Sequence, residues 1–114
     1  MSHPDHPIDI TPDDAAGLID NGEARLLDVR EDDEWQAGHS PSATHLPLGR
    51  LDPAQVPDDL PVITVCRSGG RSAKAAATLA AAGHQVSTLE GGMKAWSAAG
   101  LPVHTDDGSP GSVA

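Results

Sequence analysis

The amino-acid sequence predicts an α/β fold, in which a mostly parallel sheet of about five strands is covered by helices on both faces. Short apolar stretches alternate along the sequence with helix-favouring segments, so consecutive strands need crossover connections and run parallel. The 114 residues, 38% of them hydrophobic, suffice for one domain with one core. Phe and Tyr are absent, so Leu, Val, Ile and Ala have to build that core, and the two aromatic residues, Trp35 and Trp96, are expected to belong to it.

The N-terminal part is predicted to hold two strands with a helix between them. Residues 8–10 suit a short first strand. The helix begins with Thr11 as its N-cap and Pro12 in its first position, and Gly22 ends it. Residues 25–29 suit the second strand.

The middle of the chain is predicted to be less regular. Residues 31–37 suit a short acidic helix that stops at Gly38, and residues 44–46 suit a short strand. Four prolines between residues 47 and 61 leave room for only a turn or two of helix.

The C-terminal half returns to a regular alternation. The apolar, β-branched residues 62–65 predict a buried strand, and the Ala-rich residues 70–82 predict the longest helix, ended by Gly83. Residues 86–89 predict the last strand and residues 93–99 the last helix.

The domain is expected to span residues 8–104. Residues 1–7 are expected to form a flexible leader, without the basic and apolar regions of a signal peptide, and the polar residues 105–114 a disordered tail. No apolar run approaches membrane-spanning length. A single cysteine permits no internal disulfide, and a free thiol fits a reducing compartment, so we expect a cytoplasmic protein.

The charge distribution points to a small anionic partner. The formal charge of -10, from 17 acidic and 7 basic residues, argues against nucleic acids and anionic membrane surfaces. Three of the basic residues nevertheless gather just after Cys66, namely Arg67, Arg71 and Lys74. Such a local positive site favours a small anion over a large polyanion.

Cys66 is the strongest candidate for a catalytic residue. It lies where the buried strand ends and the longest helix begins, in a glycine-bearing turn with two arginines. Backbone N–H groups at a helix N-terminus and nearby guanidinium groups both stabilise a thiolate over a thiol. No second cysteine and no histidine with ligand spacing accompanies it, so we expect neither a metal nor a cofactor.

The spacing of the loop distinguishes between two thiolate chemistries. Four residues separate Cys66 from Arg71, whereas the loop of a cysteine-dependent phosphatase resembles C-x5-R followed by Ser or Thr. A smaller ring of backbone amides suits a single sulfur atom on Cys66 better than a tetrahedral phosphate. The spacing therefore disfavours a phosphatase or an arsenate reductase.

The chain resembles a single-domain rhodanese, a sulfurtransferase. Four ordered segments from about residue 8 to residue 104 carry the likeness; they are Cys66-Arg67-Ser68-Gly69-Gly70-Arg71, Leu27-Asp28-Val29-Arg30-Glu31, Glu34-Trp35-Gln36-Ala37-Gly38-His39-Ser40-Pro41-Ser42-Ala43, and Gly91-Gly92-Met93-Lys94-Ala95-Trp96 with Gly100-Leu101-Pro102-Val103. Ser40 and Ser42 depart from the family, which usually has an apolar residue and Gly there.

The resemblance implies that sulfur is transferred in two steps. The thiolate of Cys66 attacks the outer sulfur of a donor such as thiosulfate and becomes a persulfide. Cyanide in an assay, or a small thiol or protein acceptor in the cell, then removes that sulfur. No histidine base and no cofactor is implied.

The resemblance also implies how the loop would hold the persulfide. The backbone N–H groups of residues 67–71 would surround the terminal sulfur, and Gly69 and Gly70 would permit the backbone angles that turn them inward. Ser68 or Ser72 would donate further hydrogen bonds.

Charged residues around the loop complete the expected site. Arg67 and Arg71 would neutralise the sulfonate of the donor and the leaving sulfite. Asp28 and Arg30 would lie near the loop, where they support its arginines or frame the pocket. His39 is expected to hydrogen-bond a turn rather than to act in catalysis.

Two further functions stay open beside an active sulfurtransferase. One is a rhodanese-like binding or regulatory module without turnover, although such modules commonly lack the cysteine. The other is a sulfur carrier for a thiolation pathway, whose acceptor surface has no motif of its own.

Overall fold

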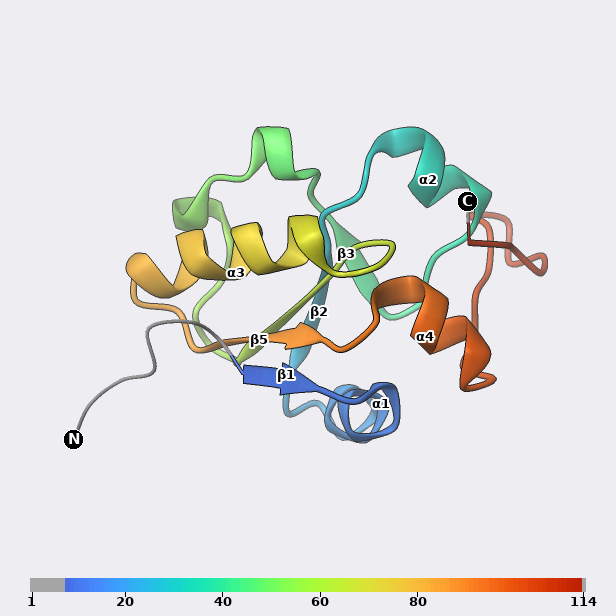
Figure 1. Cartoon of the computed structure of the whole chain (residues 1–114), viewed down its shortest axis with the longest axis horizontal. Helices are drawn as coiled ribbons and strands as arrows, with labels where there is room; N and C mark the ends of the chain where they lie inside the picture. The colour runs from blue at the N-terminus through green and yellow to red at the C-terminus, as the bar shows by residue number, and fades with distance from the viewer. Residues whose placement is uncertain (1–7, 114) are drawn as a thin grey trace.

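The computed structural model describes residues 8–113, and the leader expected at 1–7 lies outside these described residues (Figure 1). Five parallel strands form one sheet in the order β1-β5-β4-β2-β3. They are β1 (Ile8–Ile10), β2 (Arg25–Asp28), β3 (Ala43–His45), β4 (Val62–Val65) and β5 (Val86–Leu89). The predicted α/β class with about five parallel strands is therefore confirmed.

Helices cover both faces of the sheet. They are α1 (Pro12–Asp20), α2 (Asp32–Ala37), α3 (Gly70–Ala81) and α4 (Gly92–Ala98), with two short 3-10 helices, η1 (Leu48–Arg50) and η2 (Pro53–Gln55). In Figure 1, α1 and α4 lie on one side of the sheet, and α3 and the 3-10 helices lie on the other. The expected boundaries of β4 and β5 match these, and those of α3 and α4 differ from them by a single residue.

Local signals in the sequence position several of these elements. The hydroxyl of Thr11 accepts a hydrogen bond from the N–H of Asp14 at 3.3 Å, which confirms Thr11 as the N-cap of α1. All four residues of β4 are buried, because this strand lies between β2 and β5 and under helices on both faces.

The core is divided by the sheet into two clusters of side chains. One lies under α1 and α4 and contains Ala15, Leu26, Ile63, Leu89, Met93 and Trp96. The other lies under α3 and contains Leu27, Val29, Val62, Cys66, Ala75 and Leu79. Trp96 is thus a core residue as expected, and its indole N–H donates to the carbonyl of Pro102 at 2.9 Å.

Trp35 lies outside both clusters and is only partly buried, contrary to the expectation that it belongs to the core. It is stacked between two imidazoles, with ring centroids 3.5 Å from His39 and 4.6 Å from His45. Nδ1 of His39 lies 2.7 Å from the carbonyl oxygen of Trp35, which agrees with a structural role for His39.

The C-terminal segment, for which composition predicts a disordered tail, makes backbone hydrogen bonds to the rest of the domain. Residue His104 pairs with His39 in an antiparallel bridge, and the N–H of Ser112 donates to the carbonyl of Ala37 at 2.9 Å. The two segments come this close because a glycine lies at the crossing: a Cβ on Gly38 would lie 2.6 Å from the backbone of Ser112. Within the described residues, no helix is long and apolar enough to cross a membrane.

Candidate active site

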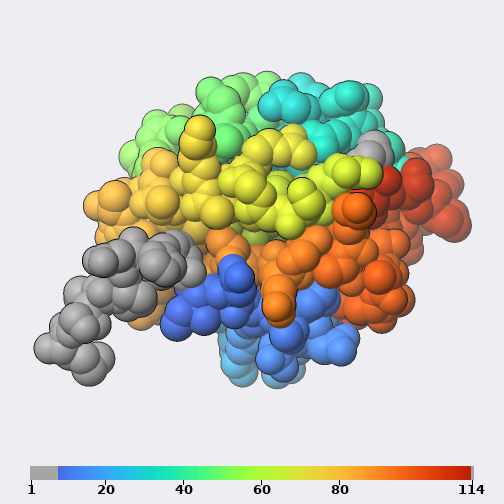
Figure 2. Space-filling view, viewed as in Figure 1, coloured from blue at the N-terminus to red at the C-terminus, as the bar shows by residue number. Residues whose placement is uncertain are grey.

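Cys66 follows the last residue of β4 directly and is 1% exposed. The loop from Cys66 to Gly69 connects β4 to α3 at the carboxyl ends of the parallel strands, where ligands of such sheets bind. Figure 2 shows this yellow-green segment at the surface, beside the orange residues of α4. Arg67 and Ser68 are exposed, so they form the outer rim of the loop.

The sulfur of Cys66 is hydrogen-bonded from inside the loop. The N–H of Gly69 donates to Sγ at 3.0 Å, and Oγ of Ser72 lies 3.5 Å from Sγ. The hydroxyl of Ser72 also reaches the carbonyl of Gly69 at 2.9 Å. Gly69 has a φ of 137°, so glycine is required for the conformation that brings its N–H to the sulfur.

These contacts decide the ionisation of the thiol. Burial alone raises the pKa of Cys66 and is the largest single influence, but the hydrogen bonds of Ser72 and the N–H groups of Gly69 and Ser68 together outweigh it. The pKa of Cys66 is therefore lowered from its ordinary value. From the sequence, the arginines and the helix N-terminus are expected to stabilise the thiolate. In the structure, the hydrogen bonds that lower the pKa come from Ser72 in the first turn of α3 and from the N–H groups of Gly69 and Ser68.

The start of α4 fixes the orientation of the loop peptides. The N–H of Met93 donates to the carbonyl of Cys66 at 2.8 Å, and the N–H of Lys94 donates to that of Arg67 at 3.1 Å. In a trans peptide the N–H points away from the carbonyl of the same unit, so the amides of residues 67 and 68 face away from α4. Gly92 permits this contact, since a Cβ there would lie 2.5 Å from the carbonyl oxygen of Arg67.

Arg71 has a protein partner that the sequence did not predict. Its guanidinium binds both carboxylate oxygens of Glu34 on α2, at 2.5 Å and 2.8 Å. This bidentate contact is the main reason that the pKa of Glu34 falls to about 2, and it raises the pKa of Arg71 in turn. A signal for it existed, because Glu34 heads one of the segments that carry the family resemblance.

Asp28 and Arg30 form a fully buried ion pair behind this contact. Nε and Nη2 of Arg30 donate to the carboxylate of Asp28, the shortest distance being 2.7 Å, and both side chains are 0% exposed. Arg30 also donates to the carbonyls of Glu34 at 3.3 Å and Gly38 at 2.8 Å. Arg30 thus contacts α2 at Glu34, the residue that binds Arg71, and at the C-cap Gly38.

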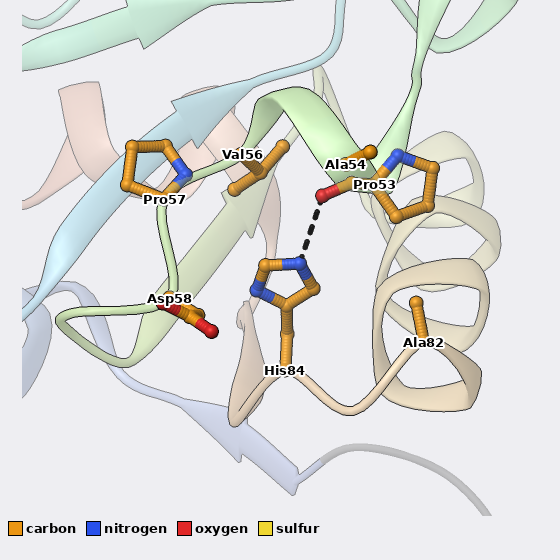
Figure 3. A pocket seen from close by; sticks show the side chains of 7 residues that line it. All are labelled: Pro53, Ala54, Val56, Pro57, Asp58, Ala82 and His84. Atoms are coloured by element: carbon orange, nitrogen blue, oxygen red, sulfur yellow. Dashed lines mark hydrogen bonds between the residues drawn. The ribbon is translucent and has the colours of Figure 1, made fainter.

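A hollow of about 430 Å³ lies at the opposite end of the sheet from Cys66, between η2 and the end of α3 (Figure 3). It is lined mainly by apolar residues, with Asp58 and His84 as its polar side chains. A ring nitrogen of His84 donates to the carbonyl of Pro53 at 3.0 Å. The hollow is lined by no Cys, Ser, Thr or Lys side chain, and no group of three or more metal-ligating side chains occurs among the described residues.

Comparison with known proteins places this site in a family. The model of the rhodanese-like domain matches residues 11–99. The chain is 38% identical over 95 residues to a sulfurtransferase of Allochromatium vinosum, a match that covers 80% of this chain and 88% of that protein. It is 31% identical over 102 residues to the thiosulfate sulfurtransferase GlpE of Vibrio cholerae, covering 87% of this chain and 96% of that protein.

Solved structures agree with the fold. The crystal structure of a rhodanese-related protein from Thermoplasma volcanium superposes with a TM-score of 0.77 at 28% identity, covering 84% of this chain and 96% of that one.

Some relatives are longer. The chain spans 61% of an uncharacterised protein of Synechocystis and 40% of an HTH-type transcriptional regulator of Mycobacterium tuberculosis, both 38% identical to it where they match. The match to the family model covers Asp28, Glu34, the loop of Cys66 and α4, and the chain belongs to the family of rhodanese-like domains.

Proposed function

We propose that this protein is a sulfurtransferase that carries a sulfane sulfur on Cys66. The observation that supports this most strongly is the hydrogen bond from Gly69 to Sγ, in a loop whose contacts lower the pKa of the thiol. A thiolate at neutral pH is a strong nucleophile toward a sulfane sulfur.

The first step loads the protein. The thiolate of Cys66 attacks the outer sulfur of thiosulfate or a similar donor; a new S–S bond forms, the donor's S–S bond breaks, and sulfite leaves with the bonding electron pair. The product is a Cys66 persulfide with its negative charge on the outer sulfur.

The second step unloads it. A thiophilic acceptor, either cyanide or the thiol of a small molecule or protein, attacks the outer sulfur, and the electron pair of that bond returns to Sγ of Cys66. No oxidant, metal or cofactor is needed, because each step exchanges one sulfur bond for another.

The loop geometry suits the charge of the intermediate. The amides of residues 67 and 68 are turned away from α4 by its contacts with the carbonyls of Cys66 and Arg67, so they are oriented for an anion on the other side. The same N–H groups would stabilise the thiolate before sulfur is loaded and the persulfide anion after it. Cys66 is the carrier, and Arg67, Ser68, Gly69, Gly70, Arg71 and Ser72 form its surroundings.

A turnover assay tests the proposal. Purified protein is mixed with thiosulfate and cyanide, and thiocyanate is measured over time, with Cys66→Ser as the control for uncatalysed transfer. Turnover by the wild type alone supports the proposal. If the wild type and Cys66→Ser give the same rate, and a second donor such as an organic persulfide gives no turnover either, the non-catalytic binding module becomes the better account.

A further inference from the structure

The positive charge of Arg71 is neutralised within the protein, by the carboxylate of Glu34. Both oxygens of Glu34 bind its guanidinium, and the side chain of Glu34 is only 16% exposed, so this contact is shielded from solvent. The pKa of Glu34, at about 2, keeps this carboxylate charged under all ordinary conditions. Arg71 therefore faces any ligand of the loop as one half of a neutral pair.

Helix α2, which carries Glu34, is acidic along its whole first turn. Glu31, Asp32 and Asp33 precede Glu34 and are exposed, and the charge of Glu31 also acts on Arg71. Asp32 is paired with Arg50 at 2.8 Å, which leaves Asp33 and Glu31 as further negative charges on this side.

These charges bear on the approach of a donor. The carboxylate of Glu34 neutralises the guanidinium of Arg71, and the nearby charge of Glu31 adds to the negative charge that acts on Arg71. The attacking group is itself an anion, on a chain with a formal charge of -10. A doubly charged donor is thus repelled more strongly than a singly charged one.

We propose that Glu34 determines donor specificity: by holding Arg71, it makes the loop of Cys66 favour organic sulfane-sulfur donors with a single negative charge over the dianion thiosulfate. The inference rests on the proposed function, because it concerns the first step of the same transfer. In that step the thiolate bonds to the sulfane sulfur of an organic thiosulfonate, and the organic sulfinate leaves with the electron pair of the broken S–S bond.

Two donors of nearly equal shape separate the effect of charge. Thiosulfate and the methanethiosulfonate ion both carry a sulfane sulfur on an oxidised sulfur, but a methyl group replaces one charged oxygen in the second. The rate of sulfur addition to Cys66 is measured for each by intact mass, without an acceptor, and the two rates are expressed as a ratio. That ratio does not depend on the fraction of correctly folded protein.

Glu34→Gln is the test variant, since Gln keeps the size and an oxygen acceptor for Arg71 but removes the charge. Its ratio of thiosulfate to methanethiosulfonate rates is expected to rise about three- to tenfold over wild type, and the rise is expected to shrink at high salt. Asp33→Asn is the matched control: it changes the net charge equally on the neighbouring residue, and we expect its ratio to change less than twofold.

The outcomes are distinct. An unchanged ratio in Glu34→Gln, or an equal rise in Asp33→Asn, overturns the role of Glu34 while leaving the proposed function intact. If neither ion, nor an organic persulfide, adds sulfur to wild-type Cys66, the proposed function fails and this inference fails with it.

Discussion

Gly92 lies against the carbonyl of Arg67 so closely that a Cβ at position 92 would come within 2.5 Å of its oxygen. Gly92 also has a φ of 64°, in the left-handed region. Through this contact the first turn of α4 reaches the loop of Cys66, which lies more than twenty residues earlier in the chain. The orientation of the loop amides therefore depends on the position of α4.

We predict that Gly92→Ala damages both stability and sulfur loading. The added Cβ would push α4 from the loop and release the carbonyls of Cys66 and Arg67, at a cost of about 2–4 kcal/mol in the free energy of unfolding. Urea unfolding and intact mass after exposure to a sulfur donor measure the two effects.

Gly100→Ala is the matched control for this variant. Gly100 has a φ of 78° but no atom within 4 Å of an added Cβ, so only the backbone penalty of about 1 kcal/mol applies. Equal losses of loading in both variants would contradict the role of the Gly92 contact.

We predict that Ser72→Ala shifts the reactivity of Cys66 to higher pH. The hydrogen bond between the Ser72 hydroxyl and Sγ of Cys66 helps to lower the pKa of the thiol, so its removal raises that pKa and reduces the thiolate fraction at neutral pH. The rate of alkylation by iodoacetamide, followed against pH, reports the midpoint. Thr78→Ala removes an exposed hydroxyl from the same helix and should not change the midpoint of the pH dependence. An unchanged midpoint in Ser72→Ala would refute the role of the Ser72 hydroxyl.

We predict that Asp28→Asn strongly destabilises the fold. Arg30 is 0% exposed and would keep its charge without a counter-ion, which costs about 3–5 kcal/mol in the free energy of unfolding. Asp59→Asn breaks the more exposed pair of Asp59 with Arg25 and should cost less than about 1 kcal/mol. Similar losses in the two variants, measured by urea unfolding, would be inconsistent with this difference in burial.

We predict that Glu34 contributes to acid stability in a defined pH window. Its pKa falls from 4.5 when unfolded to about 2 when folded, so its contribution is present above pH 4.5 and is lost as the pH falls toward 2. The difference in unfolding free energy between wild type and Glu34→Gln should therefore narrow over this range. A difference that is constant from pH 5 to about 2.5 would show that Glu34 is not held by Arg71 in solution.

The elements of the fold were predictable because their signals are local. Thr11 and Pro12 start α1, the β-branched residues 62–65 form the central strand, and glycines end the helices. The position of Cys66 at the end of that strand followed from the same local pattern.

The contacts that complete the site could not be predicted in this way. Glu34 and Arg71 are 37 residues apart and lie on different helices. In the sequence alone, each is equally consistent with an ordinary solvent-exposed charge. The C-terminal segment has the composition of a disordered tail, but Gly38 and Gly111 lie where the two backbones cross, which only the folded chain reveals.

The most direct test of the central claim is the intact mass of the reduced protein before and after exposure to a sulfane-sulfur donor, with Cys66→Ser in parallel. We expect the wild type alone to gain one sulfur atom, which cyanide or a reductant removes and which peptide mapping assigns to Cys66. If thiosulfate, methanethiosulfonate and an organic persulfide all leave the mass unchanged, or if Cys66→Ser gains the same sulfur, Cys66 is not a sulfur carrier.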